Sequence, residues 1–135
     1  MFMENESQNS ETEAEIDFDH LNQYVGGDAD LTREVFGMFQ HQVDMWGRML
    51  NADADDDTWA SVTHTLKGSA LAVGANGLAK ICEKAEDLIG DGRRPGGREV
   101  AVQNIEFRIS KVITEIQRWE YRDKLKSMRL SLIHI

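Results

Sequence analysis

The sequence predicts an all-α protein, an antiparallel up-down-up-down four-helix bundle with a short additional N-terminal helix. Proline, the strongest helix breaker, occurs only once among 135 residues, which favours helices. Apolar residues recur at three- and four-residue steps in successive segments, and no stretch alternates with a period of two. Four long amphipathic segments with short connections can bury their apolar stripes only by packing side by side, with sequential neighbours antiparallel.

The chain opens with an acidic stretch that we predict to be a disordered tail, residues 1–15. It has few apolar groups, no Lys or Arg, and five glutamates: Glu4, Glu6, Glu11, Glu13 and Glu15. Such a stretch cannot bury enough surface to offset the entropy lost on ordering. We therefore place the bundle over residues 16–120.

Two helices are predicted before residue 52. The first is short, carries Phe18, Leu21, Tyr24 and Val25, and stops at Gly26-Gly27. Asp28 or Asp30 caps the second, which ends near Asn51. Its periodic apolar residues, which we assign to the core, are Leu31, Val35, Met38, Phe39, Met45, Trp46 and Met49.

Three more helices follow. An acidic run from Asp53 to Asp57 suits the N-terminus of the third helix, Thr58–Val73, which Gly74 closes. The fourth has an apolar face of Leu78, Ile81, Cys82, Ala85, Leu88 and Ile89. After a turn rich in glycine over residues 90–97, the last helix carries Val102, Ile105, Ile109, Val112, Ile113, Ile116 and Trp119. Residues 121–135 extend this helix or form a tail.

Composition excludes several functional classes. A formal charge of −9 disfavours nucleic acid and anionic lipid as partners. No window has the roughly 20 apolar residues of a membrane span, and no secretion signal is recognisable, so we expect a cytoplasmic protein. His20, His41 and His134 lack partners at metal-ligand spacing, and the single Cys82 lies on an apolar stripe, so we predict no metal site.

One histidine stands on the wrong face for a core residue. At about 100° per residue, the core stripe of the third helix contains Trp59, Val62, Leu66, Ala70 and Val73. His64 points about 160° away from the middle of that stripe. We therefore predict that its imidazole projects to solvent from the middle of the helix.

The neighbours of His64 on this face indicate a phosphoryl acceptor. Gly68, four residues later, costs about 0.5–1 kcal/mol inside a helix but leaves space for another macromolecule to approach the ring. The ammonium of Lys67 can offset the negative charge of a phosphoryl group on the imidazole. Neutral imidazole is nucleophilic near pH 7. Ser69 is a weaker second donor at the border of the face.

A carboxylate on the fourth helix is the candidate that orients the ring. If Nδ1 donates its proton to Glu86, then Nε2 is the nitrogen that attacks. The position of Glu86 is equally compatible with an ordinary solvated surface carboxylate. We assign Leu71, with Ala60 and Ser61, to a docking patch on the same side as His64.

These residues resemble the motif of histidine-containing phosphotransfer (Hpt) domains. The matching residues are His64-Thr65-Leu66-Lys67-Gly68-Ser69, then Gly74-Ala75, Leu78, Cys82 and Glu86. Many members have a second serine where this chain has Ala70, and leucine where it has Ala85. Both replacements are small and concern packing more than chemistry.

The resemblance implies a four-helix bundle that carries phosphate between receiver domains, with His64 as the phosphorylated residue. It implies that Lys67 stabilises the phosphorylated form, that Gly68 permits docking, and that Glu86 orients the ring. The partners would be receiver domains of response regulators and of a hybrid histidine kinase. The chain would bind no cofactor of its own, because the receiver supplies Mg²⁺, and we expect a monomer.

Two alternatives remain from the sequence. The chain could be the phosphoacceptor domain that serves the separate ATP-binding domain of a histidine kinase. It could also be a helical adaptor whose His64 face binds a partner without chemistry. No phosphate-binding loop or kinase motif is present, so the chain is not expected to be an enzyme with its own ATP site.

Overall fold

The computed structural model describes residues 14–133, and within that range every regular element is helical. The helices are α2 (Phe18–Val25), α3 (Ala29–Gly47), α4 (Asp56–Ala72), α5 (Asn76–Glu86) and α6 (Gly97–Ile133), with a 3₁₀ turn, η1, at Gly90–Gly92. The predicted all-α class is therefore confirmed. Most of the predicted acidic tail, residues 1–13, lies outside the described residues, as do residues 134–135.

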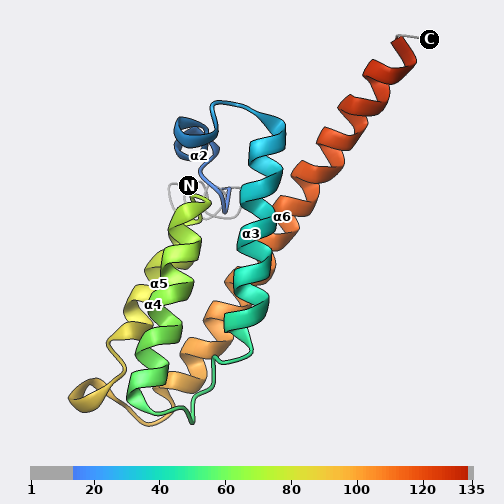
Figure 1. Cartoon of the computed structure of the whole chain (residues 1–135). Helices are drawn as coiled ribbons and strands as arrows, with labels where there is room; N and C mark the ends of the chain where they lie inside the picture. Colours follow the sequence, from blue (N-terminus) through green and yellow to red (C-terminus); the bar gives the residue numbers. More distant parts are fainter. Residues whose placement is uncertain (1–13, 134–135) are drawn as a thin grey trace, which may run out of the picture.

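Four of the helices surround one core. Helix α4 packs against α3 and α5, and α6 packs against α5 and α3, so that α4 and α6 lie diagonally across the bundle. Figure 1 shows these helices side by side, with α2 at the upper end. The largest fully buried side chains come from every helix and from the segment before α2: Ile16, Leu21, Phe36, Trp59, Val62, Leu66, Leu78, Ile105 and Ile116.

The chain before α2 is attached to the bundle at two points. The carboxylate of Glu115 in α6 accepts hydrogen bonds from the backbone N–H groups of Glu15 (2.7 Å) and Ile16 (2.9 Å). The Asp17 N–H donates to the carbonyl of Gly74 (2.9 Å), whose φ of +76° is a left-handed conformation that favours glycine. Long-range contacts therefore already include Glu15, the last residue of the predicted tail.

Aspartates cap the first three helices, and Asp28 is one of the two residues predicted to cap its helix. Asp17, Asp28 and Asp55 each accept a hydrogen bond from the backbone N–H three residues later, at 3.1, 3.0 and 2.7 Å. The N–H of Thr58, together with its side chain, lowers the pKa of Asp55. Because Asp55 is the cap, α4 begins at Asp56, two residues before the predicted start at Thr58.

Two methionines of α3, and Met49 just after its end, correct the predicted core. Met38, Met45 and Met49 are 64%, 45% and 46% exposed, and Leu31 is also exposed. The buried residues of α3 are Thr32, Phe36, Phe39 and Val43. Both sets have helical spacing, but they lie about 125° apart around the helix. The larger aromatic side chains face the neighbouring helices, and the methionines remain at the surface.

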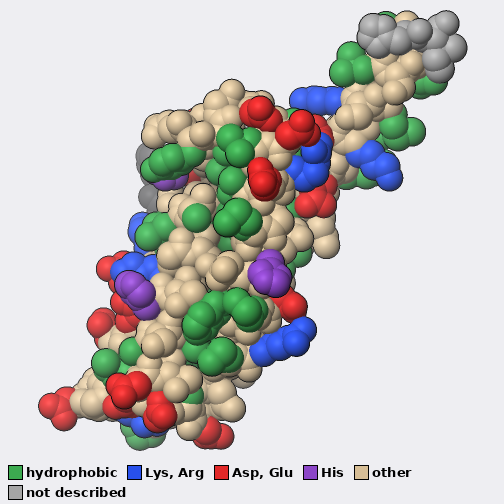
Figure 2. All heavy atoms as spheres, in the orientation of Figure 1, with side chains coloured by type: hydrophobic (Ala, Val, Ile, Leu, Met, Phe, Trp, Pro, Cys, Tyr) green, Lys and Arg blue, Asp and Glu red, His purple; other side chains and the backbone are tan. Residues whose placement is uncertain are grey.

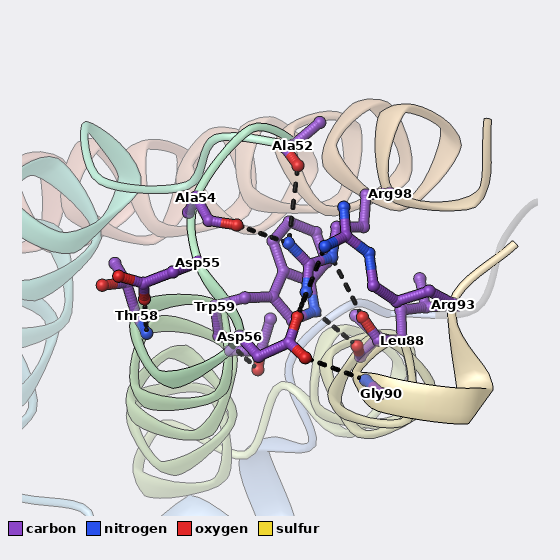
Figure 3. A network of polar contacts seen from close by, with 12 residues as sticks. Ala52, Ala54, Asp55, Asp56, Thr58, Trp59, Leu88, Gly90, Arg93 and Arg98 are labelled. Carbon is purple, nitrogen blue, oxygen red and sulfur yellow. Dashed lines mark hydrogen bonds and ion pairs between the residues drawn. The ribbon is translucent and has the colours of Figure 1, made fainter. Parts of the chain in front are cut away.

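A buried arginine joins the start of α6 to the start of α4 and to the segment after α5 (Figure 3). Arg98, in the first turn of α6, is 3% exposed. Its guanidinium donates to the carbonyls of Leu88 (2.9 Å) and Ala54 (2.6 Å) and to the carboxylate of Asp56 (2.6 Å). It also lies 4.7 Å from the ring centroid of Trp59, which favours a cation–π interaction. One side chain thus ties α6 to the loops before α4 and after α5.

The charge of Asp56 gives this network a pH dependence. The N–H of Gly90 (2.9 Å) and the guanidinium of Arg98 lower the pKa of Asp56 below its ordinary value of 3.8. A carboxylate with a lowered pKa contributes stability that is complete above the unfolded-state value and is lost as pH falls through the folded-state value.

We therefore expect Asp56→Asn to lower the thermal midpoint at pH 7, and the difference from the unmodified protein to shrink below about pH 3.8. Thermal unfolding followed by circular dichroism between pH 2.5 and 7 measures this. Asp53→Asn removes an exposed carboxylate from the same loop and is the matched control. A difference that stayed constant down to pH 2.5 would contradict the assignment.

Helix α6 continues without a break to Ile133. Of the two predictions for residues 121–135, the helical extension is thus the one seen through residue 133. No helix within residues 14–133 is long and apolar enough to cross a lipid bilayer.

Candidate functional site

The exposed side of α4 presents the histidine that the sequence singled out. The His64 side chain is 79% exposed. The residues on either side, Thr63 and Thr65, are buried and half-buried, and Val62 and Leu66 are fully buried in the core. The predicted outward direction of the imidazole is confirmed, because the core residues of α4 fix the rotation of the helix.

One ring nitrogen of His64 lies beside a glutamate of the neighbouring helix. His64 Nδ1 is 3.4 Å from Glu86 Oε1, at the last residue of α5. That oxygen is buried and has no hydrogen-bond partner among the described residues. Glu86 therefore lies beside the His64 ring, rather than being a solvated surface carboxylate. Because Nδ1 faces Glu86, Nε2 is the ring nitrogen that remains available to a partner.

The end of α5 is held in place from below the site. The indole Nε1 of Trp59 donates a 2.7 Å hydrogen bond to the carbonyl of Ala85, the residue before Glu86. Trp59 is fully buried and lies on α4, the same helix as His64. This bond fixes the end of α5 against α4, and with it the position of the glutamate relative to the ring.

Lys67 lies one turn from His64 and between two carboxylates. Its Nζ is 3.9 Å from Glu83 Oε1 and 3.9 Å from Glu86 Oε2, and its side chain is 25% exposed. The ammonium therefore lies between α4 and α5, at the outer limit of ion-pair distance from both carboxylates. A negatively charged group on the imidazole would offer it a further partner.

The surface next to His64 is open. A Cβ built on Gly68 would meet nothing within 4 Å, so the glycine leaves clear space on the outer face of α4. Ser69 is half-buried at its edge. A shallow hollow beside the ring is lined by Ala60, Ser61, His64, Glu86 and Ile89. Leu71, which we predicted to belong to a docking patch, is 47% exposed.

Three parts of this region were missed by sequence reasoning. Glu83, the second carboxylate at Lys67, has no signal of its own in the sequence. Ile89 was assigned to the apolar face of a helix, but it follows the end of α5 and is 37% exposed. The surface methionines of α3 were placed in the core. Figure 2 shows hydrophobic side chains gathered over α3 on a face that also presents histidines.

The cysteine beneath the site is not a second nucleophile. Cys82 is fully buried, and its burial, with a contribution from the charge of Glu86, raises its pKa to about 12. A thiol with that pKa stays protonated at neutral pH. The prediction that Cys82 is a core residue is confirmed. Among residues 14–133, no three His, Cys, Asp or Glu side chains lie close enough together to hold a metal ion.

The arrangement is that of a single exposed nucleophile with an oriented ring. Glu86 can keep the proton on Nδ1, which leaves the lone pair on Nε2 available to an electrophile that arrives from solvent. Lys67 supplies positive charge one turn away, and the space at Gly68 admits a large partner. A transferable anionic group such as phosphoryl matches both the nucleophile and the charge.

Comparison with known proteins agrees with this chemistry. The family model described as "Hpt domain" matches residues 8–120. Among solved structures, the chain is similar to the crystal structure of histidine phosphotransferase ShpA from Caulobacter crescentus. The TM-score is 0.69 and the sequence identity 25%, over 85% of this chain and 99% of that one. No curated protein sequence matches the chain.

Proposed function

Because this chain belongs to the Hpt domain family, which transfers phosphoryl groups through a histidine, we propose that His64 is its phosphorylated residue. His64 Nε2 would accept the group from the aspartyl phosphate of a receiver domain and pass it to a second receiver domain. The observation that carries this proposal is the buried, unpartnered Glu86 Oε1, 3.4 Å from Nδ1 of an otherwise exposed ring.

The transfer step balances without a cofactor bound to this chain. The Nε2 lone pair forms the N–P bond, and the P–O bond to the receiver aspartate breaks, so that the aspartate leaves as a carboxylate with the electron pair. The proton on Nδ1 stays in place, and the positive charge that develops on the ring faces the carboxylate of Glu86. Transfer to the second receiver is the same reaction in reverse.

Charge around the phosphoryl group would be shared between the two proteins. Lys67, already within one turn of His64, would turn its ammonium toward the phosphoryl oxygens. The receiver domain would bring Mg²⁺ with its aspartyl phosphate. Positioning and electrostatic stabilisation are the main contributions in phosphoryl transfer, so an oriented nucleophile is what this chain has to supply.

The receiver domain would dock over the middle of α4. Gly68 leaves room for it, and Leu71, Ala60, Ser61 and Ile89 offer apolar and small contacts beside His64. The exposed methionines of α3 add flexible apolar surface, which suits binding to more than one partner. We also infer that the four long helices alternate in direction, as their short connections favour.

The direct test is incubation with a phosphorylated receiver domain and Mg²⁺. We expect phosphate to appear on this chain as acid-labile, base-stable phosphohistidine, and to move to a second unphosphorylated receiver when one is added. Binding without transfer would support the adaptor instead. Sedimentation is expected to give a monomer, whereas a stable dimer would favour the dimerising phosphoacceptor domain of a kinase.

We expect Glu86→Ala to change the tautomer of His64 and to slow phosphoryl transfer by about tenfold, because the ring loses the acceptor that holds it. Nitrogen-15 shifts of the imidazole report the tautomer, and transfer rates come from rapid-quench assays. Glu83→Ala is the matched control, since it removes the carboxylate that contacts only Lys67. Equal effects of the two variants on the tautomer would show that Glu86 does not orient the ring.

Gly68 allows stability and docking to be separated. We expect Gly68→Ala to raise the free energy of unfolding by about 0.5–1 kcal/mol, because its Cβ meets no neighbour. Gly68→Gln should lower transfer from the receiver by about tenfold or more, because a long side chain then occupies the approach to the ring.

Gly37, an exposed glycine inside α3 with equally open surroundings, is the control. Gly37→Ala should be stabilising to the same extent, and Gly37→Gln should leave transfer unchanged. Chemical denaturation and the transfer assay measure both properties. Full transfer by Gly68→Gln would remove the docking role of this position.

A further inference from the structure

Helix α6 is much longer than the bundle it belongs to. Its 37 residues span about 55 Å, whereas the next longest helix, α3, has 19 residues. Trp119 is the last residue of α6 that packs against the core. Every residue from Lys124 to Ile133 is exposed, and Figure 1 shows this end of α6 projecting beyond the other helices.

The projecting part of α6 carries an apolar stripe at coiled-coil spacing. Tyr121, Leu125, Met128 and Leu132, which we call the α6 seam, follow one another at steps of four, three and four residues. Their exposed fractions are 64%, 42%, 54% and 70%. The exposed Phe107 lies fourteen residues before Tyr121, at the same heptad position, and polar residues occupy the core positions between them. This is the spacing of residues at the interface of two coiled helices.

The bundle itself does not cover the seam. At about 100° per residue, the α6 seam points about 170° away from Ile105, Val112 and Ile116, which face the core. The four seam residues span only about 60°, with the exposed Leu130 and Ile133 outside that arc. A helix that lies on a membrane surface has a broader apolar face, so the narrow stripe favours a second helix as the occupant.

The charges beside the seam decide which kind of helix fits. Arg122 and Arg129 flank it on one side and Lys124 on the other. None of these three forms an ion pair within residues 14–133. Residues 118–133 hold five cationic and two acidic side chains, a local charge of +3 on a chain of −9. The seam is thus a basic surface on an acidic protein.

Like charges make a second copy of this chain a poor occupant. Pairing two α6 seams would place arginine and lysine against arginine and lysine, and would bring Arg118 into the interface at the next core position. An anionic membrane is also disfavoured, because the rest of the chain carries −12 and would be repelled. An acidic helix meets both the apolar stripe and the cationic flanks.

We propose that the α6 seam is a docking surface for an acidic amphipathic helix of a partner protein, which pairs with α6 as a two-stranded coiled coil. The bundle holds α6 as a preformed helix, so part of the ordering cost of binding is absent. Helix α4 lies diagonally across the bundle from α6. A partner at the seam therefore leaves His64 free, and the proposal does not depend on the proposed phosphotransfer.

The test uses the full chain and a synthetic 28-residue peptide with leucine at the two core positions of each heptad and glutamate at the flanking positions. A peptide with lysine at the flanking positions is the comparison. We expect the glutamate peptide to bind, by fluorescence anisotropy, and the lysine peptide to bind at least about tenfold more weakly. Arg122→Glu combined with Arg129→Glu should reverse this preference.

Variants separate the seam from the rest of the projecting helix. Tyr121→Glu combined with Met128→Glu should weaken binding of the glutamate peptide by about tenfold or more. Leu130→Glu combined with Ile133→Glu is the matched control, because these residues are equally exposed but lie away from the seam. All four positions are at the surface, so helicity should be unchanged.

Several results would overturn the proposal. These are absence of binding by the glutamate peptide, equal binding of both peptides, or equal loss in the seam and control variants. A dimer in sedimentation that the seam variant dissociates would assign the surface to a second copy. Seam-dependent binding to phosphatidylglycerol vesicles would assign it to a membrane. Carbodiimide cross-links from Lys124 to the glutamates of residues 1–13 would assign it to the chain's own acidic segment.

Discussion

His64→Gln is expected to abolish phosphoryl acceptance and to leave the fold intact. The amide of glutamine cannot form the N–P bond, and no other described side chain of the exposed α4 face offers an imidazole. The His64 side chain is 79% exposed, so its replacement removes little packing. Incubation with a receiver domain labelled on its aspartyl phosphate, followed by phosphate-affinity electrophoresis, should show no labelled variant.

His41→Gln is the control for this experiment, because His41 is an exposed histidine of α3 outside the proposed site. It should be labelled like the unmodified protein. The circular dichroism spectrum and unfolding midpoint of both variants should match those of the parent. Substantial labelling of His64→Gln, or loss of labelling in His41→Gln as well, would reject His64 as the acceptor.

Among the variants described, Arg98→Met is expected to lower the free energy of unfolding most, by about 3 kcal/mol. The guanidinium is the hydrogen-bond donor to the carbonyls of Leu88 and Ala54, and methionine leaves both without that donor. The carboxylate of Asp56 loses its closest cation, and Trp59 loses a cation–π contact. Urea denaturation should show a lower midpoint with an unchanged m-value.

Arg94→Met provides the comparison, because Arg94 is an exposed arginine four residues earlier. Its change should alter the free energy of unfolding by no more than about 0.5 kcal/mol. At temperatures where Arg98→Met is folded, His64 should still be phosphorylated, since the bonds of Arg98 go to Leu88, Ala54 and Asp56 and not to His64 or Glu86. A similar cost for both arginines would mean that the network around Arg98 contributes little.

One aspartate cap and the direction of His64 could be predicted from local sequence patterns. Asp28 was one of the two candidate caps of the second helix, because a cap needs only its own residue and the next three, and the structure has Asp28 in that role. The outward direction of His64 followed from the angle between it and the apolar stripe of the same helix. Both inferences use residues within one helix, and the structure agrees with both.

The position of Glu86 was beyond sequence reasoning. Spacing along α5 placed it at the edge of an apolar stripe, where a solvated carboxylate and a ring partner look the same. Its distance to His64 depends on how α4 and α5 are docked, which the hydrogen bond between Trp59 and Ala85 fixes across 26 residues. Glu83 became visible as a partner of Lys67 for the same reason.

The sequence by itself determined the helical class, two candidate caps for one helix and the face on which His64 stands, because these depend on neighbours within a few residues. Only the tertiary structure decided that the methionines of α3 are exposed and that Phe36 and Val43 are buried. Only it placed Arg98 in the core. When a helix has two apolar stripes, its own sequence does not determine which stripe is buried, because burial depends on contacts with segments far away in the chain.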